Sequence, residues 1–171
     1  MSIATAPYES RQVVIQRVRE SFPDELIQFD QWVCWDLKPP KEPGKKPIKM
    51  PVDPQGYGPA STTDASTWGS FDVAARCFLA KSEVSGLGFV FSESDPFVGV
   101  DLDKCRDPVT GEIESWAEEI IDELSSYTEF SPSGTGFHII VRGSLPPKGR
   151  RKDNIEMYGS GRYFTVTGER V

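Results

Sequence analysis

The sequence has few of the residues that build metal clusters or disulfide frameworks. Its 171 residues include three cysteines and one histidine, and no two cysteines form a Cys-x-x-Cys pair. Structural zinc sites use four nitrogen or sulfur ligands at characteristic spacings, which this sequence lacks. We therefore expect Cys34, Cys77 and Cys105 to be buried free thiols.

Long apolar runs are missing too. Nowhere do about 18 apolar residues follow one another, as a membrane-spanning helix requires. The first ten residues, MSIATAPYES, contain no basic stretch followed by an apolar run. We expect a cytoplasmic protein without a membrane partner, in the host cell if the source is viral. The length suits one substantial core, so residues 1–171 are expected to form a single domain.

A net positive charge, common in nucleic-acid-binding proteins, is also absent, because the formal net charge is -7. The basic residues are nevertheless concentrated in two windows, and the remainder of the chain is strongly acidic. The windows are residues 38–49, with Lys38, Lys41, Lys45, Lys46 and Lys49, and residues 142–152, with Arg142, Lys148, Arg150, Arg151 and Lys152. Each window could be a solvated loop or could contact phosphates, and the charge clusters alone do not distinguish these two interpretations.

Apolar periodicity predicts three helices. Residues 10–22, 71–79 and 116–124 carry apolar side chains at spacings of three and four, which place them on one helical face. Ser70 is placed to cap the second helix, and Pro23 ends the first.

The remaining apolar segments predict strands. They are residues 32–37, 86–92, 97–103, a short segment around Thr128, and residues 137–141, 155–158 and 163–167. We expect the second and third to form a hairpin, and the Pro- and Lys-rich stretch through Pro59 to be a long irregular loop. Helices interrupting strands favour an α/β (α+β) fold, a two-layer sandwich with a mixed β-sheet. The four tryptophans are expected in the core.

Two acids close the strand FVGVDLD. Because side chains alternate along a strand, Asp101 and Asp103 should project from one face, close enough to converge on divalent ions. An isolated Asp-x-Asp can equally be the solvated end of a surface strand. A calcium loop starting at Asp101 is disfavoured, since Cys105 and Arg106 occupy positions that require an oxygen ligand and a glycine.

Two later segments add further polar candidates. In SPSGTGFHIIVRG a Ser/Gly turn precedes a strand containing His138, and the turn's N–H groups could bind phosphate. An ordinary hairpin with a hydrogen-bonded histidine explains the same pattern. In IEMYGSGRYFTVTG, Glu156 points away from its apolar neighbours and could join the two aspartates, while Arg162 follows a Gly-rich turn.

Taken in order, VDLD, SPSGTGFH and IEMYGSGRYFTVTG resemble the three motifs of the archaeo-eukaryotic primase superfamily, especially phage and plasmid primase-polymerases. The resemblance extends from QWVCW to TVTGE and so covers most of the chain. It implies an RRM-like core with flanking helices, acting on a DNA template and primer with deoxynucleoside or ribonucleoside triphosphates. It also implies a longer replication protein, with a helicase region following the C-terminal end.

The resemblance further assigns roles to individual residues. Asp101, Asp103 and Glu156 match the carboxylates that hold two Mg²⁺ or Mn²⁺ ions, and His138 matches the contact to the nucleotide phosphates. Looser parts of the resemblance suggest further nucleotide-binding residues, which are Ser133, Gly134, Lys49, Arg162 and Tyr163.

A second class of function stays open on the sequence. A non-catalytic single-strand-binding module could use the basic windows, and its binding would be sensitive to salt but indifferent to the acids. A replication-initiator endonuclease is disfavoured because it uses paired metal-binding histidines and this chain has one histidine.

Overall fold

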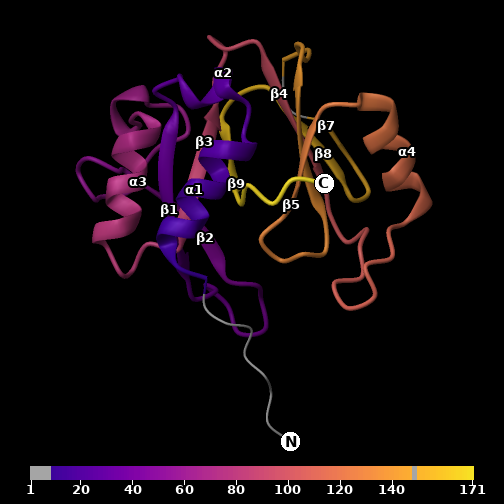
Figure 1. Cartoon of the computed structure of the whole chain (residues 1–171), viewed down its shortest axis with the longest axis horizontal. Helices are drawn as coiled ribbons and strands as arrows, with labels where there is room; N and C mark the ends of the chain where they lie inside the picture. Colours follow the sequence, from indigo (N-terminus) through magenta and orange to yellow (C-terminus); the bar gives the residue numbers. More distant parts are fainter. Residues whose placement is uncertain (1–8, 148–149) are drawn as a thin grey trace, which may run out of the picture.

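The computed structural model describes residues 9–147 and 150–171 of the chain (Figure 1). Its helices are α1 (Arg11–Ser21), α2 (Asp24–Ile27), the 3₁₀-helix η1 (Ala65–Thr67), α3 (Phe71–Ala80) and α4 (Ser115–Leu124). Its strands are β1 (Trp32–Lys38), β2 (Ile48–Val52), β3 (Gly86–Phe91), β4 (Phe97–Leu102), β5 (Tyr127–Phe130), β6 (Phe137–Arg142), β7 (Arg150–Lys152), β8 (Ile155–Tyr158) and β9 (Arg162–Val166).

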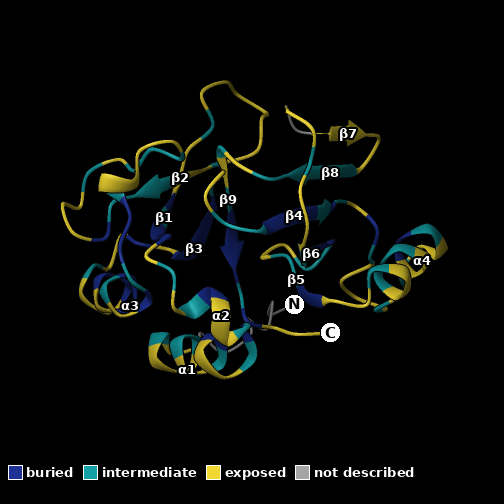
Figure 2. Cartoon of the chain, turned by 90° about the horizontal axis from the view of Figure 1, so that it is seen from above, coloured by how far each residue is buried: buried dark blue, intermediate teal, exposed yellow. Residues whose placement is uncertain are grey.

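The strands form two sheets, and the fold is an α+β sandwich as predicted. The first sheet has the order β2-β1-β3-β9 and the second the order β5-β6-β4-β8-β7. All strand pairs in the described residues are antiparallel, so the expected single mixed sheet is wrong. Figure 2 shows α1, α2 and α3 along one side of the first sheet and α4 beside the second.

The predicted hairpin between β3 and β4 is also wrong. Residues 92–96 carry the chain from the first sheet into the second, so the two strands never pair. Asp95 organises this turn, because its carboxylate accepts hydrogen bonds from the amides of Ser92 and Phe97 and from the Gln31 side chain. Turn residues mark a change of direction, but they do not specify which strand lies alongside the next.

The expected irregular loop through Pro59 contains a strand instead. β2 pairs antiparallel with β1 across Cys34–Val52 to Lys38–Ile48. Pro51 is tolerated within β2 because this strand lies at the edge of the sheet, where one row of N–H groups has no partner strand. The proline and lysine content hid the strand, since both residues are typical of edges.

The three predicted long helices are confirmed, and serine caps explain where α1 and α3 begin. Ser10 accepts a hydrogen bond from the Val13 amide at the start of α1, and Ser70 accepts one from the Val73 amide at the start of α3. Arg11 joins the two helices. Its guanidinium donates to four carbonyls in and after the last turn of α3, those of Phe78, Lys81, Ser82 and Val84.

The main core lies between the first sheet, α1 and α3, and it extends to the second sheet. Phe91 and Phe164 pack against β4 at Gly99, where an added Cβ would lie 2.5 to 2.7 Å from their rings. A side chain at this position would force the sheets apart. A smaller core lies between the other face of the second sheet and α4, and includes Val100 and Ile139.

Several expectations about buried residues can be compared with this core. All three cysteines are free and buried, as predicted. Trp32 and Trp68 are buried and Trp116 packs against the smaller core, whereas Trp35 lies half-buried on the opposite face of the first sheet. In the described part of the chain, no helix is both long enough and apolar enough to cross a bilayer.

Replacing Arg11 by alanine should lower the free energy of unfolding by about 1.5 to 3 kcal/mol, because it leaves carbonyls at the end of α3 without a charged donor. Urea unfolding followed by circular dichroism measures the change. Arg76→Ala, an exposed change on α3, is the matched control and should alter the value by less than about 0.5 kcal/mol. Equal stabilities of the two variants would contradict the role of Arg11.

Candidate active site

Polar side chains from neighbouring strands meet on one face of the second sheet. Asp101 on β4 lies directly opposite His138 on β6 and directly opposite Glu156 on β8. Residues opposite each other in a sheet project from the same face, about 4.5 to 5.5 Å apart at Cβ. Figure 2 shows β4 between β6 and β8 in the middle of the molecule. The register therefore brings together three of the predicted site residues.

Asp101, His138 and Glu156 form a row across the strands, and this row continues to both edges of the sheet. Glu129 on β5 lies opposite His138, and Arg151 on β7 lies opposite Glu156. Contacts follow this order: the Glu129 carboxylate is 3.7 Å from His138 Nδ1, His138 Nε2 is 3.8 Å from Asp101 Oδ1, and Arg151 Nε is 3.1 Å from Glu156 Oε1. Acidic and basic groups thus alternate along most of the row.

Asp103 lies just beyond the end of β4. Its amide donates a hydrogen bond of 2.8 Å to the carbonyl of Asn154, which precedes β8. This bond prolongs the pairing of β4 with β8 by one step. Asp103 is therefore held beside the start of β8, two residues along the chain from Asp101.

The electrostatics of Asp101 reflect this crowding. Burial raises the pKa of its carboxyl above the ordinary value, and the negative charges of Asp103 and Glu156 act in the same direction. His138 and Lys49 oppose the rise. The ionised group therefore sits in a partly buried position beside two like charges, where a divalent cation would be stabilising.

The chemistry of these acids fits Mg²⁺ or Mn²⁺, since both ions prefer carboxylate oxygens. As the side chains lie, however, no three histidine, cysteine or acidic residues in residues 9–147 and 150–171 form a closed metal-binding cluster. Glu156 is paired with Arg151. An ion bound through Glu156 would compete with that guanidinium for the carboxylate.

His138 is buried with 7% of its surface exposed, and its ring is fixed on two sides. Nδ1 is 3.0 Å from the carbonyl oxygen of Thr165 on β9, and the ring stacks on Phe164 with centroids 4.5 Å apart. A carbonyl can only accept, so Nδ1 carries a proton, and Nε2 is turned toward Asp101.

The Ser/Gly turn before β6 lies against the segment that follows β4. The Thr135 carbonyl accepts hydrogen bonds from the amides of Cys105 and Arg106, and Arg106 Nη1 donates to the carbonyl of Gly134. Gly136 allows this approach, because an added Cβ would lie 2.2 Å from the carbonyl oxygen of Leu102. The turn holding Ser133 is thereby brought next to Asp103.

The turn offers fewer free phosphate donors than its composition indicates. The Gly134 amide donates to the carbonyl of Ser131, and the Ser133 hydroxyl is shared with the hydroxyls of Ser131 and Thr135. Hydroxyls at Ser133 and Thr135 are the groups of this turn that can reorient toward a ligand.

Lys49 and Tyr163 meet on the face of the first sheet that carries Trp35. The Tyr163 hydroxyl donates to the Lys49 carbonyl at 2.8 Å, and Lys49 Nζ lies 5.7 Å from the centre of the Trp35 ring. Burial lowers the pKa of the Lys49 ammonium, and the charges of Asp101 and Asp103 oppose the shift. Burial raises the pKa of the Tyr163 phenol, so that it remains a donor. Lys49 is thus near enough to Asp101 and Asp103 for their charges to act on its ammonium group.

Arg162 is not part of the row of polar side chains. Its guanidinium lies 5.0 Å from the centre of the Tyr158 ring, and the residue is exposed at the start of β9. Lys148 of the second basic window falls outside the described residues.

Sequence reasoning missed Glu129 and saw Arg151 only as one member of a basic window. Strand alternation could have predicted that Glu129 and Tyr127 project from the same face of a strand. Only the register shows that Glu129 lies opposite His138.

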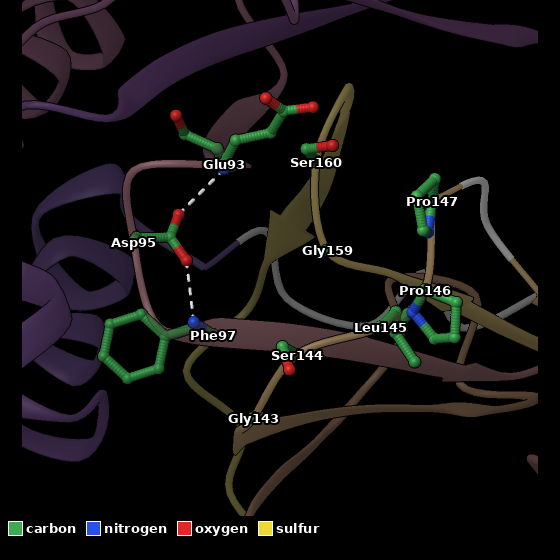
Figure 3. Close-up of a pocket in the computed structure, with 11 residues that line it drawn as sticks. Glu93, Asp95, Phe97, Gly143, Ser144, Leu145, Pro146, Pro147, Gly159 and Ser160 are labelled. Carbon is green, nitrogen blue, oxygen red and sulfur yellow. Dashed lines mark hydrogen bonds between the residues drawn. The ribbon is translucent and has the colours of Figure 1, made fainter.

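A cavity of about 360 Å³ lies at the other end of β4 (Figure 3). It is lined by the turn between β3 and β4 and by residues around Gly143 and Gly159. Phe97, which begins β4, borders it, whereas Asp101 is four residues further along. Asp95 points into its own turn in Figure 3, because its oxygens are occupied by the amides of Ser92 and Phe97. This cavity is separate from the row of acids.

The chain is similar to a phage DNA primase-polymerase. This relative is from Nitratiruptor phage NrS-1. The two sequences are 41% identical over 150 residues, which cover 84% of this chain. The match spans 20% of the relative, so the chain corresponds to about a fifth of that protein. No protein-family model matches the chain. The similarity supports a primase-polymerase family.

Asp101→Asn should stabilise the protein at neutral pH in the presence of a metal chelator. The folded-state pKa of Asp101 is raised above the ordinary value of 3.8, so ionisation destabilises the folded chain at every pH above the folded pKa. The advantage of asparagine should shrink as the pH falls through that pKa and vanish below about 3.8. Thermal unfolding across pH tests this. Asp122→Asn, on the exposed face of α4, serves as control, and a destabilised Asp101→Asn at pH 7 would contradict the account.

Proposed function

We propose that this chain is the catalytic core of a template-directed DNA primase-polymerase of the archaeo-eukaryotic primase superfamily, which adds nucleotides by two-metal-ion nucleotidyl transfer. One observation carries the proposal: Asp101 and Glu156 lie opposite each other on paired strands, and Asp103 is held beside them by its bond to Asn154. The phage relative supports the same class of activity.

Asp101, Asp103 and Glu156 are the residues that would hold two Mg²⁺ or Mn²⁺ ions. When bound, such ions activate the primer 3′ hydroxyl and stabilise the triphosphate and its pyrophosphate leaving group. The acids supply oxygen ligands whose mutual repulsion an ion relieves. Lys49, coupled to Asp101 and Asp103, balances part of that negative charge.

The incoming nucleotide would lie between this row and the turn before β6. His138 is the proposed phosphate contact through Nε2, which faces Asp101 and must itself carry a proton to donate to a phosphate oxygen. Ser133 and Gly134 in the adjacent turn are proposed to lie beside the same phosphates. Lys49, Tyr163 and Arg162 are proposed to bind the same nucleotide from the first sheet. The substrates are deoxynucleoside or ribonucleoside triphosphates, and the partners are a DNA template and primer.

Two exposed basic segments support a DNA partner. β7 consists of three consecutive exposed residues, Arg150, Arg151 and Lys152, and it ends the second sheet beside Glu156. Lysines of the first window occupy exposed positions in and after β1. Phosphates of a nucleic acid crossing the row of acids could pair with these groups.

A non-catalytic single-strand-binding module is the second candidate, and the basic β7 strand favours it. It would bind single-stranded DNA with strong salt dependence and without regard to the acids. A row of charged residues in a sheet can also be purely structural, so a measurement of enzymatic activity distinguishes the polymerase from the binding module.

Asp101→Asn, Asp103→Asn and Glu156→Gln should each reduce primer extension by about a hundredfold or more, because each removes an anionic ligand used in the transition state. Extension of a labelled primer on a DNA template, with Mg²⁺ or Mn²⁺ and in their absence, measures the effect. De novo synthesis without a primer, tested in the same reactions, separates priming from extension.

Asp122→Asn is the matched control, since it removes the same charge from the exposed face of α4. Binding to single-stranded DNA should survive all four changes. Undiminished extension by folded Asp101→Asn would refute the proposal, and salt-dependent binding without any extension by the parent chain would favour the binding module.

A further inference from the structure

A carboxylate that the proposed chemistry does not use lies next to the site. Glu129 is 1% exposed and is among the most deeply buried large side chains of the protein. Burying a carboxylate is unfavourable unless the group is hydrogen-bonded or paired. Its position in the same row as His138, Asp101 and Glu156 suggests that it serves the site and not the core alone.

The two oxygens of Glu129 are occupied by different groups. Oε1 accepts from the Thr167 amide at 3.1 Å and lies 3.7 Å from His138 Nδ1. Oε2 accepts from the Gly168 amide at 2.8 Å and from the Tyr127 hydroxyl at 2.7 Å. Both amides follow β9 in the chain, whereas Glu129 belongs to β5, so this one side chain links the first sheet to the second.

Main-chain bonds continue the link on both sides of Glu129. The Phe130 amide donates to the Glu169 carbonyl, and the Val171 amide donates to the Thr128 carbonyl. The Thr167 hydroxyl donates to the Phe130 carbonyl at 2.8 Å. The segment after β9 therefore runs along β5 and fixes where β9 ends.

β9 in turn supplies both contacts that orient His138. The ring stacks on Phe164, and Nδ1 donates to the Thr165 carbonyl. Thr165 is two residues from the first amide that Glu129 holds. A shift of β9 relative to β5 would therefore move the carbonyl away from the imidazole, and Nε2 would no longer be held toward Asp101.

We propose that Glu129 is a positioning residue for His138. By holding the Thr167 and Gly168 amides, it places the Thr165 carbonyl so that the imidazole donates from Nδ1 to this carbonyl and turns Nε2 toward Asp101. The consequence for nucleotide binding rests on the proposed function, whereas the orientation of the ring does not.

Glutamine at position 129 disrupts this arrangement with little change in size. An amide has one oxygen, so its NH₂ group would have to face an N–H of Thr167 or Gly168, a contact between two donors. The change is therefore expected to displace the end of β9. Thr167→Val is the matched structural control, because it removes the two hydrogen bonds of the Thr167 hydroxyl, to the Phe130 carbonyl and from the Glu169 amide, and leaves both amides bonded to Glu129.

The chain has one histidine, so nuclear magnetic resonance of a ¹⁵N-labelled sample reports His138 without ambiguity. The parent chain should show an Nδ1-bound proton that exchanges slowly with water. In Glu129→Gln this signal should be lost or clearly shifted, whereas in Thr167→Val it should be retained even if the melting temperature falls. Primer extension should show a KM for nucleotide raised about tenfold in Glu129→Gln, with a smaller change in kcat.

Three results would overturn the proposal. They are a parent chain whose Nδ1 carries no protected proton, a folded Glu129→Gln with an unchanged histidine signal, and a Thr167→Val signal altered as strongly as that of Glu129→Gln. The first needs no variant, so the test holds even if Glu129→Gln fails to fold. Because the histidine signal is read without DNA or nucleotide, failure of the proposed function, seen as extension by Asp101→Asn, would be recognised separately.

Discussion

The site depends on the register of β4 between β6 and β8. Pairing at Asp101 places His138 on one side and Glu156 on the other, and the opposite face of the same strands packs on α4. A slip of one residue would turn the acids into that apolar layer and expose Val100 and Leu102 instead. Burial of the apolar face against α4 therefore also determines which side chains lie on the polar face. It holds three distant parts of the sequence in a single row.

The division of the strands into two sheets places residues of the first sheet beside the row of acids in the second. The change of sheet between β3 and β4 leaves the first sheet free to contribute Lys49 from its edge strand and Phe164 and Thr165 from β9. Gly99 and Gly136 permit the close approaches on which this depends, one between the sheets and one between the Ser/Gly turn and the end of β4. The row of acids consequently lies beside a seam where residues of both sheets can meet a ligand. The proposed nucleotide would lie at this seam, between the row and the turn before β6.

Much of the local structure was predictable from sequence, and the pairing of strands was not. Helical periodicity located α1 and α3 closely, with Ser70 correctly predicted as the cap of α3, and alternation correctly put Asp101 on a polar face. The hairpin of β3 and β4 was wrong because a turn signal does not specify the partner strand. β2 was missed because proline and lysine at an edge strand look like a loop. Glu129 escaped notice since its role is visible only through contacts with residues about forty positions away. The roles of the nucleotide-binding residues stay predictions.

The most direct test of the account is the location of bound metal. A crystal of the chain soaked with Mn²⁺ and a non-hydrolysable nucleoside triphosphate, measured with anomalous scattering from manganese, would show where the ions bind. The account predicts two peaks about 3.5 to 4 Å apart, within coordination distance of Asp101, Asp103 and Glu156. Manganese bound elsewhere, with Glu156 still paired to Arg151 and no ion beside the two aspartates, would contradict it.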